Sequence, residues 1–198
     1  LILRITTPDD SELAMSSASQ LAEAYDGSTL AYQDETRIND EQPKVTRARA
    51  TRPTPGAGVT LTVEGDSDDV GRKQLPPETI FSAEHSKRLI AAAAAGQGQY
   101  SATVVDGTFT KGYVVSAFIA KARPAPRGTY SGPAFPDATV WPVRLGYFPL
   151  GEAAGEPEFE ASAQIGASGI AAELVIEQAG LKLKATLVGL KLLEPEGC

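Results

Sequence analysis

The fold is decided by the stretch LPPETIFSAEHSKRLIAAAAAG, residues 75–96, which is the one segment of the chain whose pattern requires a helix. Ser82 is a good N-cap, because its hydroxyl can accept a hydrogen bond from a free backbone N–H of the first turn. The run Ala91–Ala95 has the highest helix propensity, and Gly96 supplies the left-handed residue that commonly ends a helix. We therefore expect one helix over about residues 82–95, whose alanine face can approach a sheet closely.

On both sides of this helix the sequence is typical of β-strands at hairpin spacing. Apolar residues alternate with threonines over Val59–Val63, and Asp-Gly pairs at Asp26-Gly27 and Asp106-Gly107 mark hairpin turns. About ten or eleven strands are expected. They cover residues 1–7, 12–25, 28–32, 44–52, 59–63, 100–105, 111–122, 141–148, 158–167, 169–178 and 181–193.

These elements predict a mainly β protein with a long antiparallel curved sheet, a β-spiral or half-barrel-like meander, wrapped around one central helix. The 198 residues have the size of one domain, so residues 1–198 are predicted to form a single domain. Because the chain opens directly on a strand, we expect it to lack a signal peptide and its first strands. Residues 66–71 are expected to form an acidic loop and residues 123–139 a proline-rich loop, and Pro142 predicts an edge strand or a bulge.

Composition argues against several classes of function. Eighteen Lys and Arg against 25 Asp and Glu give a net charge of −7, which disfavours nucleic-acid binding. The densest cations, Lys44, Arg47, Arg49 and Arg52, alternate like the solvated face of a strand. No apolar run approaches the roughly 18 residues of a membrane span, so an integral membrane protein is not expected.

The sequence contains few residues suited to catalysis. His85 is the only histidine and Cys198 the only cysteine, which argues against a His-based metal site and a Cys-rich zinc site within the chain. We predict no cofactor, no metal and no enzymatic activity, and interpret His85 as a packing or capping residue. Cys198 is either a free terminal thiol or half of a disulfide whose partner lies upstream of residue 1.

A series of motifs runs in order along essentially the whole chain. They are Asp26-Gly27-Ser28, the helix stretch from Leu75-Pro76 through Phe81 and His85 to Gly96, Val105-Asp106-Gly107, Trp141-Pro142-Val143-Arg144-Leu145-Gly146-Tyr147-Phe148, Pro157-Glu158-Phe159, Ser168-Gly169-Ile170, and a leucine-rich end closing on Cys198. This succession resembles the EipB-type cell-envelope integrity proteins of Gram-negative bacteria. The resemblance departs at Ser82, where the family has proline after phenylalanine.

The resemblance implies a secreted periplasmic β-spiral protein that maintains the envelope under stress and has no assigned enzymatic activity. It implies a tetratricopeptide-repeat protein as a type of partner, and a disulfide from Cys198 to a cysteine upstream of residue 1. The family-motif residues in this chain are Phe81, His85, Gly96, Asp106, Gly107, Trp141, Pro142, Arg144, Tyr147 and Phe148.

Two functions follow as hypotheses. The first is a non-catalytic scaffold or binding protein, because strand edges and the faces of a curved sheet are natural docking surfaces. The alternative is a carrier of lipid or another apolar ligand in a half-barrel cavity. The oligomeric state is open, with a homodimer as one expectation.

Overall fold

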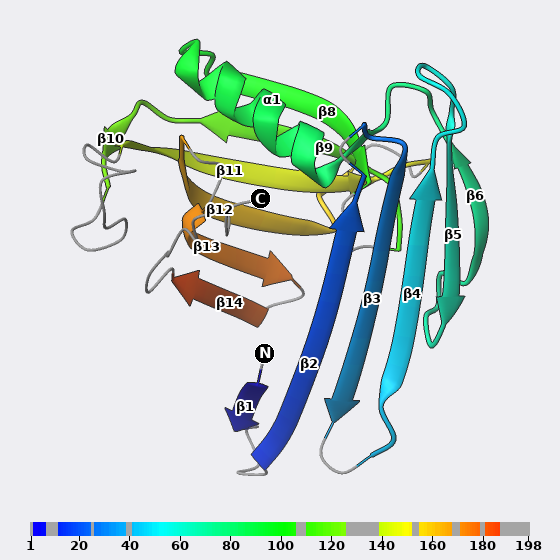
Figure 1. Cartoon of the computed structure of the whole chain (residues 1–198). Coiled ribbons are helices and arrows are strands. Elements are labelled where there is room, and N and C mark those ends of the chain that lie inside the picture. The colour runs from blue at the N-terminus through cyan, green and yellow to red at the C-terminus, as the bar shows by residue number, and fades with distance from the viewer. Residues whose placement is uncertain are drawn as a thin grey trace, which may run out of the picture. The chain divides into compact units, whose positions relative to one another are not determined.

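The computed structural model describes residues 2–6, 12–24, 26–38, 41–105, 110–125, 139–151, 155–167, 171–178 and 181–186. Within these ranges the chain forms fourteen strands and one helix (Figure 1). In chain order they are β1 (Ile2–Thr6), β2 (Glu12–Glu23), β3 (Thr29–Ile38), β4 (Lys44–Thr51), β5 (Val59–Gly65), β6 (Gly71–Leu75), β7 (Ile80–Phe81), α1 (Ser82–Ala94), β8 (Gln99–Val105), β9 (Tyr113–Ile119), β10 (Arg123–Pro124), β11 (Thr139–Pro149), β12 (Phe159–Gly166), β13 (Ala171–Gln178) and β14 (Leu181–Thr186).

Hydrogen bonding divides the described strands into two sheets, each with a linear order and therefore two edges. The six-stranded sheet is a meander in which each strand pairs with the next, from β1 to β6. The eight-stranded sheet has the order β14-β13-β12-β11-β9-β8-β7, with β10 added beside β11. The chain also forms two compact units. The first unit comprises Leu1–His85 and Thr103–Tyr113, and the second comprises Ser86–Ala102 and Val114–Cys198.

The six-stranded sheet buries one face, and strand alternation decides which one. Leu30 on β3, Ala50 on β4 and Leu61 on β5 are register partners, and all three are 0% exposed. Val59 and Val63 extend this buried row along β5, where threonines alternate with them. The period-two pattern of this segment therefore fixes the core of the sheet.

The eight-stranded sheet follows the same rule but has an aromatic pair in its core. Along β9, buried and exposed side chains alternate strictly from Tyr113 to Ile119. Tyr147 on β11 and Phe159 on β12 are register partners, and their rings stack with centroids 4.2 Å apart. Both side chains are nearly inaccessible to solvent, so the stacking is part of the core.

The helix α1 connects two parallel strands. Ile80 and Phe81 of β7 pair in parallel with Val104 and Val105 of β8, and a parallel pair requires a crossover connection of this kind. Its end has the geometry that the sequence predicted: Gly96 has a φ of 72°, and the N–H of Gln97 donates to the carbonyl oxygen of Ala92 at 2.9 Å. These are the features of a Schellman motif.

The fold class predicted from sequence is confirmed: the protein is mainly β, with antiparallel sheets and one helix. Three details differ. The strand count was too low, because the short strands β6, β7 and β10 carry little apolar alternation. One pair, β7 with β8, is parallel. Pro142 lies within β11, which pairs with β12 on one side and with β9 and β10 on the other.

Pro142 is tolerated there because the ladder is interrupted beside it. Its carbonyl oxygen accepts a hydrogen bond from the N–H of Ala120, which follows the last residue of β9. The N–H and C=O groups of one strand residue point to the same side, so the missing N–H of the proline also falls at this point. The next partner on that side, β10, begins at Arg123. The prediction of an edge strand was therefore wrong for the strand as a whole.

Candidate functional site

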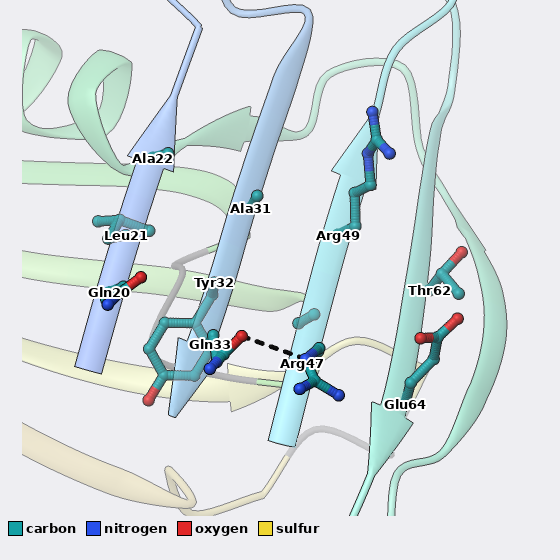
Figure 2. Close-up of a pocket in the computed structure, with 11 residues that line it drawn as sticks. Gln20, Leu21, Ala22, Ala31, Tyr32, Gln33, Arg47, Arg49, Thr62 and Glu64 are labelled. Atoms are coloured by element: carbon teal, nitrogen blue, oxygen red, sulfur yellow. Dashed lines mark hydrogen bonds between the residues drawn. The ribbon is translucent and has the colours of Figure 1, made fainter. Parts of the chain in front are cut away.

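One hollow lies in the first unit, on the six-stranded sheet. Its volume is about 580 Å³. Residues of four neighbouring strands line it (Figure 2): Gln20, Leu21, Ala22, Ala31, Tyr32, Gln33, Arg47, Ala48, Arg49, Thr62 and Glu64.

Cross-strand register shows that the hollow belongs to the face opposite the buried core, which we call the polar face. One row of register partners runs Gln20, Gln33, Arg47 and Glu64, and the next runs Ala22, Ala31, Arg49 and Thr62. Strand alternation assigns the other three lining residues to the opposite face. The hollow forms where two alanines lie beside longer polar side chains, so that the surface of β2 and β3 is low and β4 rises beside it.

The charged groups of the hollow are arginines of β4 and a glutamate of β5. Arg47 and Arg49 are both exposed, and Nε of Arg47 donates a hydrogen bond to Oε1 of Gln33 at 3.1 Å (Figure 2). Glu64 is the register partner of Arg47, yet no ion pair joins these two described residues. The side chain of Arg49 makes no hydrogen bond or ion pair with any residue that the structure describes. The guanidinium groups are therefore available to a binding partner.

Arg52, the fourth cation of the sequence pattern, has a structural role instead. It donates a hydrogen bond to the carbonyl oxygen of Thr79, and its guanidinium carbon lies 5.7 Å from the centroid of the Phe81 ring. This cation–π geometry adds to the attachment of the segment before α1. Of the four cations, Arg47 and Arg49 are thus exposed on the polar face, Lys44 is exposed at the start of β4, and Arg52 packs against β7.

The first turn of α1 is capped by a residue that the sequence did not identify. Oε2 of Glu23, at the end of β2, accepts a hydrogen bond from the N–H of Ala83 at 2.9 Å. A carboxylate at a helix N-terminus satisfies an otherwise free N–H group and interacts favourably with the helix dipole. The two residues are 60 positions apart, so local pattern gave no signal for this cap.

The predicted family-motif residues belong to both compact units. Phe81 and His85 lie at the start of α1, with 2% and 5% exposure, and Gly96 ends that helix. Five others lie along β11 in the second unit: Trp141, Pro142, Arg144, Tyr147 and Phe148. Three predicted residues, Asp106, Gly107 and Cys198, lie outside the described residues. The burial of His85 agrees with a packing role.

A second, smaller hollow lies in the second unit, with a volume of about 280 Å³. Its lining consists of Phe118, Ala120, Arg123, Pro142, Val143, Arg144, Ser162, Ala163 and Gln164. Phe118 is 58% exposed, which is unusual for a phenylalanine. Arg144 lies 3.5 Å from the carboxylate of Glu160, and both side chains are largely exposed.

Within the described ranges, no group of three or more His, Cys, Asp or Glu side chains is arranged to hold a metal ion. None of the helical segments that the structure describes has the length and apolar character needed to cross a membrane.

Comparison with known proteins identifies a family and similar solved structures. A family model described as EipB-like matches residues 1–194. The chain is similar to the crystal structure of a beta-barrel-like protein of domain of unknown function DUF1849 from Brucella abortus, with a TM-score of 0.79 and 19% sequence identity. That similarity covers 95% of this chain and 77% of the Brucella chain, and at this identity it shows the fold. Among curated proteins, none matches this chain.

Proposed function

The chain belongs to the EipB-like family, and from that premise we propose that it is a non-catalytic periplasmic protein that maintains cell-envelope integrity by binding a protein partner. The observation that carries the proposal is the hollow of the polar face, where Arg47 and Arg49 are exposed beside Gln33. A volume of about 580 Å³ is within the roughly 300–1,000 Å³ of binding sites. The lining of the hollow includes two arginines, a glutamate and two glutamines, which favours a polar partner surface over a wholly apolar ligand.

The placement of the histidine supports binding over catalysis. His85 is 5% exposed and lies at the start of α1, outside the lining of the hollow. A general base must come within hydrogen-bond reach of its substrate, which a side chain buried in this way does not.

We propose a tetratricopeptide-repeat protein as the partner class, in line with the resemblance that the motifs carry. Such proteins stack helical repeats into extended concave surfaces, and these accommodate a strand face or a sheet edge of another protein. The polar face of the six-stranded sheet offers a strand face of this kind.

Site-specific photo-crosslinking in the periplasm tests this function. A photoreactive amino acid replaces Thr62, inside the hollow, or Ser116, an exposed residue of β9 that serves as the matched control. We expect one discrete product from position 62, identified by mass spectrometry as the same envelope protein in replicate cultures, and none from position 116. We also expect loss of the chain to sensitise cells to detergent. Normal detergent resistance without the chain, or equal products from both positions, would contradict the proposal.

A carrier of apolar ligands is the second candidate, supported by Phe118 at the hollow of the second unit. Its volume of about 280 Å³ suits part of an acyl chain. Native mass spectrometry of protein purified from periplasm decides this question. A co-purifying lipid that is lost in Phe118→Ser supports the carrier, whereas protein of the bare chain mass contradicts it.

A further inference from the structure

We propose that Arg47 and Arg49 of β4 bind an extended acidic segment of a partner protein, in which carboxylates occur at every second residue. This inference rests on the proposed function, since it specifies the chemistry of the partner at the same hollow. The spacing, the free donors and the surrounding charges of the two arginines select carboxylates of a protein.

The spacing of the two arginines matches that of an extended peptide. Arg47 and Arg49 lie two residues apart on one strand and on the same face, as their register partners Gln33 and Ala31 show. A strand rises by about 3.3 Å per residue, so the two side chains start about 6.6 Å apart. In an extended peptide, side chains at alternate positions have the same separation. One carboxylate can therefore lie opposite each guanidinium.

The donors of both arginines are suited to carboxylates. Nε of Arg47 is held by Oε1 of Gln33 at 3.1 Å, which orients the guanidinium and leaves its two terminal nitrogens for a ligand. Arg49, which has no described partner, retains all its donors. Guanidinium and carboxylate groups form paired charge-assisted hydrogen bonds that are about twice as strong as neutral ones. Gln33 thus acts as a positioning residue for the first arginine.

The surroundings of the pair limit where the acidic segment can lie. Thr62 separates Arg49 from Arg72 of β6 along one row, so that row carries two positive charges and no acidic side chain. Glu64 lies beside Arg47 in the other row and repels a carboxylate placed over β5 at that level. The acidic segment is therefore expected to run along β4, beside the short side chains of Ala22 on β2 and Ala31 on β3. In a chain of net charge −7, this positive row is a local feature that complements an acidic partner.

Fluorescence anisotropy on the purified chain tests this inference with two fluorescein-labelled peptides of the same composition. One peptide repeats Ser-Glu four times, and the other, the block peptide, repeats Glu-Glu-Ser-Ser twice, so that no two of its glutamates lie two residues apart. We expect the alternating peptide to bind about tenfold more tightly than the block peptide, the loss expected when one charge-assisted contact is misaligned. Binding should weaken as salt is added.

The variants separate the arginine pair from a general loss of charge. Arg47→Gln/Arg49→Gln should weaken binding of the alternating peptide by about tenfold or more, and Gln33→Ala by less. The matched control Arg88→Gln/Lys121→Gln removes the same charge from exposed positions of the second unit and should leave binding unchanged. Every substituted side chain except Gln33 is exposed, so we expect all variants to fold. Thermal unfolding of each variant checks this expectation.

Several outcomes would overturn the inference. They are equal affinity for the two peptides, equal losses in the arginine and control variants, tighter binding of a single-stranded oligonucleotide than of the alternating peptide, and dimerisation of the chain that the arginine variant abolishes. The crosslinking experiment at Thr62 is independent of these results. A crosslinked partner without peptide binding would leave the proposed function standing and remove this inference. Peptide binding by the chain, together with normal detergent resistance of cells that lack it, would leave this inference standing and remove the proposed function.

Discussion

The two sheets obey the same alternation and yet present different chemistry. In the six-stranded sheet the buried face is aliphatic, with Leu30 and Leu61 at 0% exposure, and the polar face carries the arginines of the hollow. In the eight-stranded sheet the core contains the stacked rings of Tyr147 and Phe159, and the second hollow is lined by the exposed ring of Phe118. The difference teaches that strand alternation fixes a core in both places but leaves the outward positions free to be charged or apolar.

The largest effect is expected from removing the aromatic pair. Phe159→Ala deletes a ring that is 4% exposed and stacked on Tyr147, which should lower the free energy of unfolding by about 3–5 kcal/mol. Urea denaturation measures this change with two probes. Far-UV circular dichroism follows both sheets, whereas fluorescence of Trp141, the only tryptophan, follows the second unit.

If residues 1–198 form a single domain, the two probes of Phe159→Ala will show coincident transitions. Loss of the tryptophan signal at lower urea than the circular dichroism signal would contradict the single-domain prediction. Ser162→Ala, an exposed position of the same strand, is the control and should change stability by less than about 0.5 kcal/mol.

A pair of glycine variants compares the two sheets directly. Gly65 ends β5 with a φ of 97°, and a Cβ there would lie 2.0 Å from the carbonyl oxygen of Val45. Gly146 on β11 would bring a Cβ to 3.2 Å from the ring of Phe148, a side chain that can shift. We expect Gly65→Ala to cost about 2–4 kcal/mol and Gly146→Ala about 1 kcal/mol, as measured by urea denaturation. Equal costs would mean that the backbone contact in the first unit relaxes freely.

A smaller effect concerns acid stability of the first unit. Burial of Asp69 raises its pKa, but this is outweighed by hydrogen bonds from Thr110 and Lys73 and by the charges of Lys73 and Lys111, so the pKa is lowered from 3.8. A carboxyl whose pKa is lower in the folded state stabilises the fold above its unfolded pKa. That contribution is lost as the pH falls through the lowered value.

Asp69→Asn should therefore be less stable than the parent chain at pH 7, and the difference should shrink below about pH 4. Urea denaturation at pH 7 and at pH 2 measures this difference in the free energy of unfolding. A difference that persists unchanged at pH 2 would show that Asp69 acts through packing or through neutral hydrogen bonds.

The smallest effect is expected on the exposed surface of the eight-stranded sheet. Arg144 and Glu160 are 3.5 Å apart with side chains 73% and 53% exposed, and such pairs contribute little in water. Arg144→Gln should change the free energy of unfolding by less than about 0.5 kcal/mol in urea denaturation. A larger loss would give this motif arginine a structural role that its exposure does not suggest.

Local pattern was sufficient where a residue's neighbours in sequence determine its state. The alternation of Val59–Val63 predicted β5, and the alanine run with Gly96 predicted α1 and its end. The cap of α1 by Glu23 could not be predicted, because it comes from another strand. The strand β7 is only two residues long, and its partner is β8, beyond the helix, so no period could reveal it.

The candidate site was predictable to a similar degree. The alternation of Arg47 and Arg49 placed both on a solvated strand face, and the structure exposes both. The hollow beside them depends on Ala22 and Ala31, which join the arginines only through the register of two hairpins. Register follows from turn lengths and cross-strand packing, so the sequence indicated the cations but not the depression next to them.

The interleaving of the two compact units has a consequence for how such a protein can be modified. The chain passes between them after residues 85, 102 and 113, and both α1 and β8 contribute residues to each unit. Neither unit can be produced by cutting the gene at one site, and neither can be exchanged between homologues as an intact cassette. Changes of specificity in this architecture are therefore expected to arise by substitutions at outward positions.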